Sequence, residues 1–330
     1  ATTIEYILCC SVHERYMEQT RRRFLTASAV VGTGALAGCN AVTDAIPFVG
    51  GGGLGDYQQW AYPADQFNQD ADGMNVNVTN QQAIYENRKS FYPNTYRALR
   101  GTYSTVGLIG RDVSMDLRLP QGRVLKGSYD TSEVVAELED DTNTEFESDG
   151  NYSGYEVYVP SDADTVRQAV AVADSAIVFG QRVEPPFGSD WDAVSATDVV
   201  EGIIDTKGGN GTRATSNNDD FSTLVNTLDS GTSISAQTRS DEVSSDQADA
   251  ESGIFEGQVA NGESLSVNGD TMKRQWVFVF SGEGDVNTSD LNDWIEANDN
   301  SGTFARARNV KVEQNGRAGV VTAKFDTYSL

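Results

Sequence analysis

Hydrophobic and polar residues alternate with the period of a β-strand in several parts of the chain. In residues 276–280, Trp276, Phe278 and Phe280 alternate with Val277 and Val279, which predicts a strand with apolar side chains on both faces. Asn315-Gly316 is typical of the tight turn of a hairpin. Strands or strand pairs are expected at residues 103–119 with 123–130, at 155–159, at 168–180 with a turn near 174–175, and at 308–325.

Other segments have the period of a helix. Phe221, Leu224, Val225 and Leu228 lie at i, i+3, i+4 and i+7, after capping residues at 217–218. Helices are therefore expected at residues 219–229, at 199–204 (ended by Gly208-Gly209) and at 81–100 (broken near Pro93). Two further helices are expected, one that starts at residue 131 or 132 and one that starts at residue 288 or 289. Because the strands pair as hairpins, the predicted fold class is α+β, with antiparallel sheets and helices packed on one face.

A short pattern recurs in the two halves of the chain. Residues 111–116, 122–123 and 129–131 resemble residues 308–313, 316–317 and 325–327. This recurrence predicts two related modules, at 56–190 and 191–330, the second of which contains an acidic loop at 240–252. The alternative is that two unrelated hairpins look alike, and the sequence leaves it open.

The N-terminal stretch RRRFLTASAVVGTGALAGC, from Arg21 to Cys39, has the layout of a removable export signal. A basic start precedes an apolar run that is shorter than the roughly 20 residues of a transmembrane helix. The run ends in small residues, and the glycines at 50–53 that follow are typical of a flexible tether.

Two motifs in this stretch resemble known signals. Residues 20–25, with Arg21, Arg22, Phe24 and Leu25, resemble a twin-arginine (Tat) export motif, and residues 36–39 resemble a lipobox. The resemblance implies that Cys39 is lipidated and that the Tat machinery exports the chain. Residues 1–16 are then an upstream extension, 17–38 a signal peptide and 39–55 a lipidated tether. The protein is expected on the outer face of the cytoplasmic membrane, held there by its lipid.

The composition is strongly acidic. The chain has 49 Asp and Glu against 24 Lys and Arg, for a net charge of −25. The many carboxylates of such a chain repel one another in dilute buffer, and concentrated salt screens this repulsion. The composition resembles that of haloarchaeal surface proteins, and the chain as a whole resembles uncharacterised haloarchaeal lipoproteins, which implies a salt-adapted archaeal protein. No basic patch is apparent, so nucleic acid is not expected as a partner.

Several kinds of catalysis are excluded for the mature chain. The single histidine and both cysteines other than Cys39 lie within residues 1–16. Without histidine there is no Ser-His-Asp or Cys-His site and no His-ligated zinc or blue copper, and without thiols there is no iron–sulfur cluster. We therefore predict no cofactor, no catalytic residue and no enzymatic activity.

Three sets of residues remain as candidates for binding or modification. Asp70, Asp72 and Asn75 have a weak calcium-loop spacing, although no Glu follows at the right distance. An aromatic cluster could line a ligand groove or simply be core: Trp60, Tyr62, Phe91, Tyr92 and Tyr96. Four Asn-X-Ser/Thr triplets are candidate N-glycosylation sites: Asn77, Asn151, Asn210 and Asn287.

Three functions are compatible with these features. The first is a lipid-anchored surface protein that binds a small solute or scaffolds other envelope proteins without catalysis. The second is a solute-binding lipoprotein of a transporter, although such folds use parallel βαβ units rather than hairpins. The third is an extracellular hydrolase that depends on carboxylates.

Overall fold

The computed structural model describes residues 56–71, 73–141, 144–161 and 166–329. The expected upstream extension, signal peptide, Cys39 and tether lie outside the described residues.

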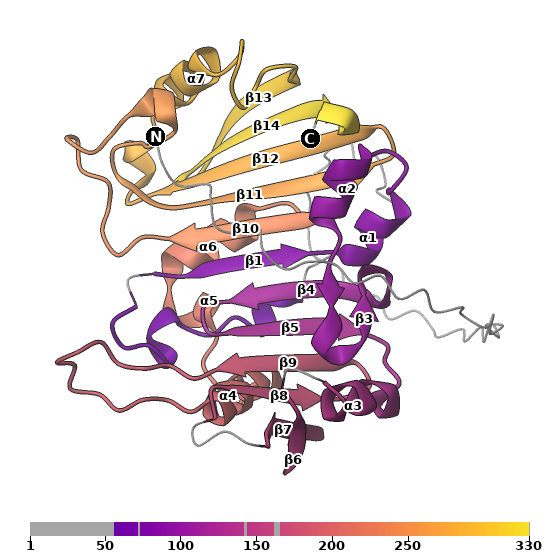
Figure 1. Cartoon of the computed structure of the whole chain (residues 1–330). Coiled ribbons are helices and arrows are strands. Elements are labelled where there is room, and N and C mark those ends of the chain that lie inside the picture. The colour runs from indigo at the N-terminus through magenta and orange to yellow at the C-terminus, as the bar shows by residue number, and fades with distance from the viewer. Residues whose placement is uncertain (1–55, 72, 142–143, 162–165, 330) are drawn as a thin grey trace, which may run out of the picture. The chain divides into compact units, whose positions relative to one another are not determined.

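Twelve antiparallel strands form one sheet in the order β13-β14-β12-β11-β10-β1-β4-β5-β9-β8-β7-β6 (Figure 1). The strands are β1 (Asn75–Thr79), β4 (Val113–Leu119), β5 (Gly122–Gly127), β6 (Phe146–Tyr152), β7 (Tyr155–Pro160), β8 (Gln168–Val172), β9 (Ala176–Gln181), β10 (Ser233–Thr238), β11 (Gln258–Asn268), β12 (Thr271–Phe280), β13 (Arg308–Asn315) and β14 (Ala318–Asp326). A separate pair is formed by β2 (Thr102–Tyr103) and β3 (Leu108–Ile109). The α+β class and the antiparallel pairing are confirmed.

The strands form one continuous sheet rather than two. Strands from before and after residue 190 are joined by the pairing of β1 with β10, in which Val78 lies opposite Ile234. The two hairpins that carry the recurring pattern have different places in this sheet. The pair β4–β5 is internal, whereas β13 forms an edge. Two separate modules are therefore not seen.

The helices are α1 (Gln81–Glu86), α2 (Pro93–Leu99), α3 (Thr131–Glu139), α4 (Ala196–Gly208), α5 (Ala214–Asn217), α6 (Asp219–Thr227) and α7 (Thr288–Ala297). Their ends follow from the sequence. The Asn218 side chain accepts a hydrogen bond from the Phe221 amide at the start of α6, and Gly209 ends α4 in the left-handed conformation. The helix expected at 81–100 is two short helices, with Pro93 at the first position of the second.

Helices pack on both faces of the sheet, so the expectation of helices on one face is wrong. Alternation along β12 explains why: Trp276 and Phe278 point to one face, and Val277 and Val279 point to the other. Both faces are therefore apolar here, and both need cover.

We call the face under α4, α5 and α6 the covered face. Its core contains apolar residues of the central strands, such as Val78 and Leu117, packed against Val199, Ile203 and Phe221 of the helices. The helices approach the strands closely. A Cβ on Gly180 of β9 would lie 2.5 Å from the carbonyl oxygen of Ala196 in α4.

We call the opposite face the mixed face, because it is apolar at both ends and polar between them. One end carries an aromatic cluster with Trp276, Phe278 and Trp294, beside α1 and α7. The other end packs Leu125 and Ile177 against Leu138 of α3. Between them the strands present residues such as Asn77 and Arg118, which are exposed.

Candidate functional site

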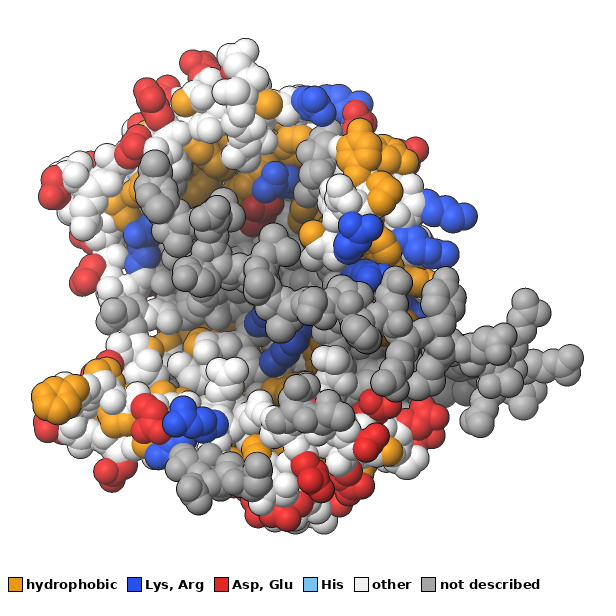
Figure 2. All heavy atoms as spheres, in the orientation of Figure 1, with side chains coloured by type: hydrophobic (Ala, Val, Ile, Leu, Met, Phe, Trp, Pro, Cys, Tyr) orange, Lys and Arg blue, Asp and Glu red, His pale blue; other side chains and the backbone are white. Residues whose placement is uncertain are grey.

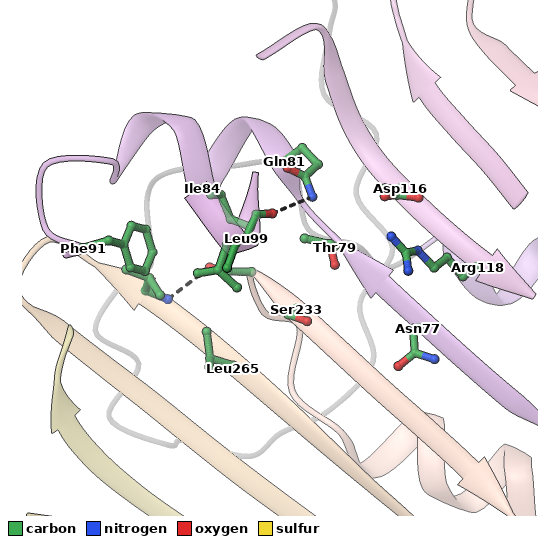
Figure 3. Close-up of a pocket in the computed structure, with 13 residues that line it drawn as sticks. Asn77, Thr79, Gln81, Ile84, Phe91, Leu99, Asp116, Arg118, Ser233 and Leu265 are labelled. Carbon is green, nitrogen blue, oxygen red and sulfur yellow. Dashed lines mark hydrogen bonds between the residues drawn. The ribbon is translucent and has the colours of Figure 1, made fainter. Parts of the chain in front are cut away.

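A pocket of about 480 Å³ lies on the mixed face, between the α1–α2 segment and the central strands (Figure 3). This volume is within the range of ligand sites for small molecules. Its lining comes from β1, β4, β10 and β11 below, and from α1, α2 and the loop between them above: Asn77, Thr79, Gln81, Ile84, Phe91, Ala98, Leu99, Asp116, Arg118, Thr232, Ser233, Leu265 and Val267.

Strand alternation places the polar lining. Along β1, Val76 and Val78 are buried in the covered face, so Asn77 and Thr79 point to the mixed face. The antiparallel register sets Asn77 opposite Arg118 and Thr79 opposite Asp116 on β4. Polar groups from two neighbouring strands therefore meet at one side of the pocket.

The side chain of Gln81 fixes the apolar lining above the sheet. Its Oε1 accepts a hydrogen bond from the Gly101 amide at 2.7 Å, and its Nε2 donates to the carbonyl oxygen of Leu99 at 3.3 Å. These bonds tie the first residue of α1 to the end of α2. They hold Ile84 and Leu99 over the sheet, where Figure 3 shows them on the side of the pocket away from Arg118.

A partly buried ion pair, between Asp116 of the pocket lining and Arg123, lies at the pocket. Both carboxylate oxygens of Asp116 accept hydrogen bonds from Arg123, at 2.7 and 2.8 Å, and Asp116 is only 3% exposed. The hydroxyl of Tyr103 donates to the same carboxylate at 3.1 Å, and the guanidinium of Arg123 lies 4.7 Å from the Tyr103 ring centre. Burial and the charge of Asp116 raise the pKa of Tyr103, which keeps this hydroxyl a donor.

Arg118, unlike Arg123, has no carboxylate partner among the described residues. Within the described residues it makes no ion pair, and the nearby carboxylate of Asp116 is already held by Arg123. One end of the pocket thus has a cation with no ion-pair partner among the described residues, next to hydrogen-bonding side chains on Asn77, Thr79 and Ser233. The other end is apolar, with Ile84, Phe91, Leu99 and Leu265 (Figure 3).

The pocket lining contains few of the groups that acid–base or metal chemistry uses. Among the described residues that line the pocket, Asp116 is the only carboxylate, whereas glycoside hydrolysis uses two. In the described part of the chain, no group of three or more His, Cys, Asp or Glu side chains is arranged to hold a metal ion.

The aromatic residues predicted as a groove are divided between the two faces. Trp60 and Tyr62 are 1% and 0% exposed and belong to the core of the covered face, so they do not line a groove with the others. In the structure these two residues are part of the core, which was the alternative interpretation of their sequence pattern. Phe91 lines the pocket, Tyr96 is partly buried against the aromatic cluster, and Tyr92 is exposed.

The candidate calcium residues do not form a described site. Asp72 lies outside the described residues, and Asn75 begins β1. The Asp70 carboxylate accepts hydrogen bonds from the Ser189 hydroxyl at 3.0 Å and the Trp191 indole at 2.9 Å. Asp70 therefore fastens the loop after β9, and no metal ligation is visible in its described contacts.

The four candidate glycosylation residues differ in their surroundings. Asn151 and Asn210 are exposed, near the β6–β7 turn and after α4. Asn77 lines the pocket, and its amide donates to Asn75 at 2.9 Å. Asn287 caps α7: its Oδ1 accepts from the Ser289 amide, and its Nδ2 donates to Asp290. All four asparagines are exposed, and the side chains of Asn77 and Asn287 make the hydrogen bonds given above.

Sequence reasoning did not identify Arg118 or the pocket. A signal was present: polar residues at 75, 77 and 79 alternate with Val76 and Val78, a pattern that predicts a strand with one polar face. The residues that complete the pocket, such as Leu265, are distant in sequence, and only the sheet order brings them together.

Comparison with known proteins adds little to this picture. No family model and no curated protein matches the chain. Two solved structures of the Treponema protein TP0453, crystal forms III and I, are similar at a TM-score of 0.43, with 8% and 9% identity. The alignments cover 82% of this chain and 94% and 93% of the TP0453 chains. A likeness of this size says nothing about what the present chain binds.

None of the helices in the described ranges combines the length and the apolar character needed to cross a bilayer.

Proposed function

We propose that the chain is a non-catalytic binding protein of the cell envelope, and that the pocket on the mixed face takes an anionic amphiphile. The ligand class is a carboxylate or phosphate head attached to an apolar tail. The head would lie against Arg118 and accept hydrogen bonds from Asn77 and Thr79, and the tail would lie among Ile84, Phe91 and Leu99.

The observation that carries this proposal is the uncompensated charge of Arg118. The chain has about half as many basic as acidic residues, yet Arg118 makes no described ion pair, although Asp116 is nearby. Arginine matches the geometry of carboxylate and phosphate, and an ionised hydrogen bond is stronger than a neutral one. A ligand that supplies the missing negative charge would therefore bind here in preference to its neutral analogue.

The alternatives have less support. A solute-binding protein of a transporter is usually built from parallel βαβ units, whereas every strand pair among the described residues is antiparallel. A carboxylate-dependent hydrolase needs a second carboxylate near Asp116. A scaffold for other envelope proteins needs no pocket, and it becomes the preferred function if the pocket binds nothing.

The cellular setting is part of the proposal and rests on the sequence motifs. Export by the Tat machinery, lipidation at Cys39 and placement on the outer face of the membrane would keep the pocket near amphiphilic molecules. Salt adaptation, an archaeal origin and glycosylation at the four candidate asparagines remain predictions of the same kind.

A fluorescent fatty acid tests the ligand class. Dansylaminoundecanoic acid and its methyl ester share the fluorophore and the tail and differ in the head group, which is ionised in the acid and neutral in the ester. Fluorescence titration of both probes therefore measures what the anionic head contributes. We expect the acid to bind at least about tenfold more tightly than the ester, since a charged hydrogen bond contributes about 1.5–3 kcal/mol.

Arg118→Gln supplies the decisive variant, and Arg167→Gln is its matched control. Arg167 is exposed, outside the pocket lining and without a described ion pair. Arg118→Gln should weaken binding of the acid by about tenfold or more and leave the ester unaffected, whereas Arg167→Gln should change neither. Equal affinity for acid and ester, or wild-type binding by Arg118→Gln, would overturn the proposal.

A further inference from the structure

Positive charge is concentrated in one segment of this acidic protein. Residues 81–126 contain eight Lys and Arg against three Asp and Glu, whereas the whole chain has 24 against 49. The expectation that the chain has no basic patch therefore fails for this segment. Net charge averages over the chain and so hides a local reversal of sign.

Four of these cations lie on the surface of the α1–α2 segment, and we call them the basic surface: Arg88, Lys89, Arg97 and Arg100. Figure 2 shows Lys and Arg side chains gathered beside apolar ones over α1 and α2, whereas Asp and Glu predominate over α3. None of the four makes an ion pair with a described carboxylate. Elsewhere such pairs are common, as between Arg317 and Asp220.

The described contacts of the basic surface leave its charge uncompensated. Arg88 donates to the carbonyl oxygen of Tyr85 at 2.9 Å, and its guanidinium lies 4.3 Å from the Tyr85 ring centre. Arg97 donates to the amide oxygen of Asn94 at 3.2 Å. All of these described partners are neutral, and none of the four cations has an ion-pair partner within the described ranges, which leaves their charge for an anionic partner.

Aromatic side chains project beside these cations. Tyr92 and Tyr328 are 56% and 42% exposed, and their rings meet edge to face with centroids 5.2 Å apart. The hydroxyl of Tyr328 donates to the carbonyl oxygen of Lys89 at 3.1 Å, which fastens the C-terminal end of the described chain to the same surface. Exposed tyrosines next to Lys and Arg are typical of proteins at a membrane–water interface.

We infer that the basic surface docks on an anionic lipid bilayer, with Arg88, Lys89, Arg97 and Arg100 against lipid phosphates and Tyr92 and Tyr328 in the headgroup layer. Basic residues near an anionic membrane are attracted to it, and arginine pairs with phosphate through two hydrogen bonds. This contact is distinct from a lipid anchor at Cys39, because it is made by the folded part of the chain.

A bilayer fits this surface better than nucleic acid does. The segment that carries the cations also supplies Phe91, Ala98 and Leu99 to the pocket lining. Docking would therefore place the apolar end of the pocket next to the lipid. A nucleic acid would match the positive charges, but it would make no contact that uses the apolar end of the pocket.

Vesicle co-sedimentation tests the inference. The full chain carries Cys39→Ser in every sample, so that an acyl chain cannot contribute, and vesicles contain either phosphatidylglycerol or phosphatidylcholine alone. We expect preferential binding to phosphatidylglycerol at about 0.15 M salt, and weaker binding at about 1 M salt, where the Debye length is about 3 Å. Circular dichroism establishes that each sample is folded in both conditions.

Two triple variants with the same change in net charge separate docking from general electrostatics. Lys89→Glu/Arg97→Glu/Arg100→Glu should lower partitioning onto phosphatidylglycerol by at least about a hundredfold, at about fivefold for each cation removed. The matched control is Arg167→Glu/Lys311→Glu/Lys324→Glu, whose residues are exposed and make no ion pair within the described ranges. It should change partitioning by less than about threefold.

Three outcomes would overturn the inference: equal losses in the two triple variants, equal binding to both lipids, or preference for a DNA duplex over phosphatidylglycerol vesicles. The titration of Arg118→Gln with the fatty acid is a separate measurement. Docking and ligand binding can therefore fail independently, and each failure is recognisable.

Discussion

The two faces of the central strands differ although their residues alternate along the same strands. On the covered face, Val78 and Leu117 are fully buried under helices. On the mixed face, their neighbours Asn77 and Arg118 are exposed and line a pocket. The comparison separates two roles that overlap in many proteins. Over these central strands the covered face supplies the buried apolar contacts, so the mixed face can carry polar groups that contribute little to folding and can serve a ligand.

The largest loss of stability is expected when a carboxylate is introduced on the covered face. Val78→Asp places a carboxylate in the apolar core of the covered face, where no described group is positioned to pair with it. We expect a loss of about 4 kcal/mol or more in the free energy of unfolding, measured by urea denaturation.

Asn77→Asp is the matched control, since it adds the same group one residue earlier on the mixed face. It should change the free energy of unfolding by no more than about 0.5 kcal/mol. It should also weaken binding of the fatty acid, because a carboxylate opposite Arg118 competes for its charge. Equal destabilisation by the two variants would show that the faces do not divide the roles as described.

A smaller effect is expected where a helix contacts the covered face most closely. In Gly180→Ala the new Cβ would lie 2.5 Å from the carbonyl oxygen of Ala196 and 2.8 Å from Cγ2 of Val200. Because backbone cannot move as easily as a flexible side chain, α4 must shift, and we expect a loss of about 1–3 kcal/mol in urea denaturation. Gly284→Ala is the control: no heavy atom lies within 4 Å of its Cβ, so it should be nearly neutral. A neutral Gly180→Ala would contradict close packing on this face.

Local patterns predicted most of the elements but not their assembly. The hairpin β8–β9 and the helix α6 follow from alternation and capping that lie within a few residues, and the structure confirms both. The edge-to-edge order of twelve strands depends on contacts such as β1 with β10, which are about 150 residues apart in sequence. Such pairing leaves no local signal, so neither the single sheet nor the pocket between distant strands was predicted.

The residues of the candidate site could not be identified from local sequence patterns either. An aromatic residue that lines a pocket and one in a core have the same sequence signal. Phe91 and Trp60 are both buried, and only the folded structure places Phe91 at the pocket and Trp60 in the core of the covered face. Arg118 is informative because Asp116, the carboxylate in the lining of the same pocket, is held by Arg123. That relation needs three side chains in space, so the sequence alone did not single out Arg118.

The smallest expected effect concerns the outer surface of α4, on the covered face. Burial, and then the charges of Asp198, Asp205 and Asp149, raise the pKa of Glu201. A raised pKa in the folded state means that folding favours the protonated carboxyl, so the stabilisation is present at acidic pH and is lost as pH rises through that pKa.

Glu201→Gln should therefore stabilise the protein by about 0.5 kcal/mol at neutral pH and by nothing below about pH 4. Urea denaturation at both pH values measures this difference, and Glu256→Gln, which removes the same charge from an exposed site, is the control. If both variants stabilise equally at neutral pH, the repulsion belongs to the whole acidic surface, and Asp198, Asp205 and Asp149 have no special part in it.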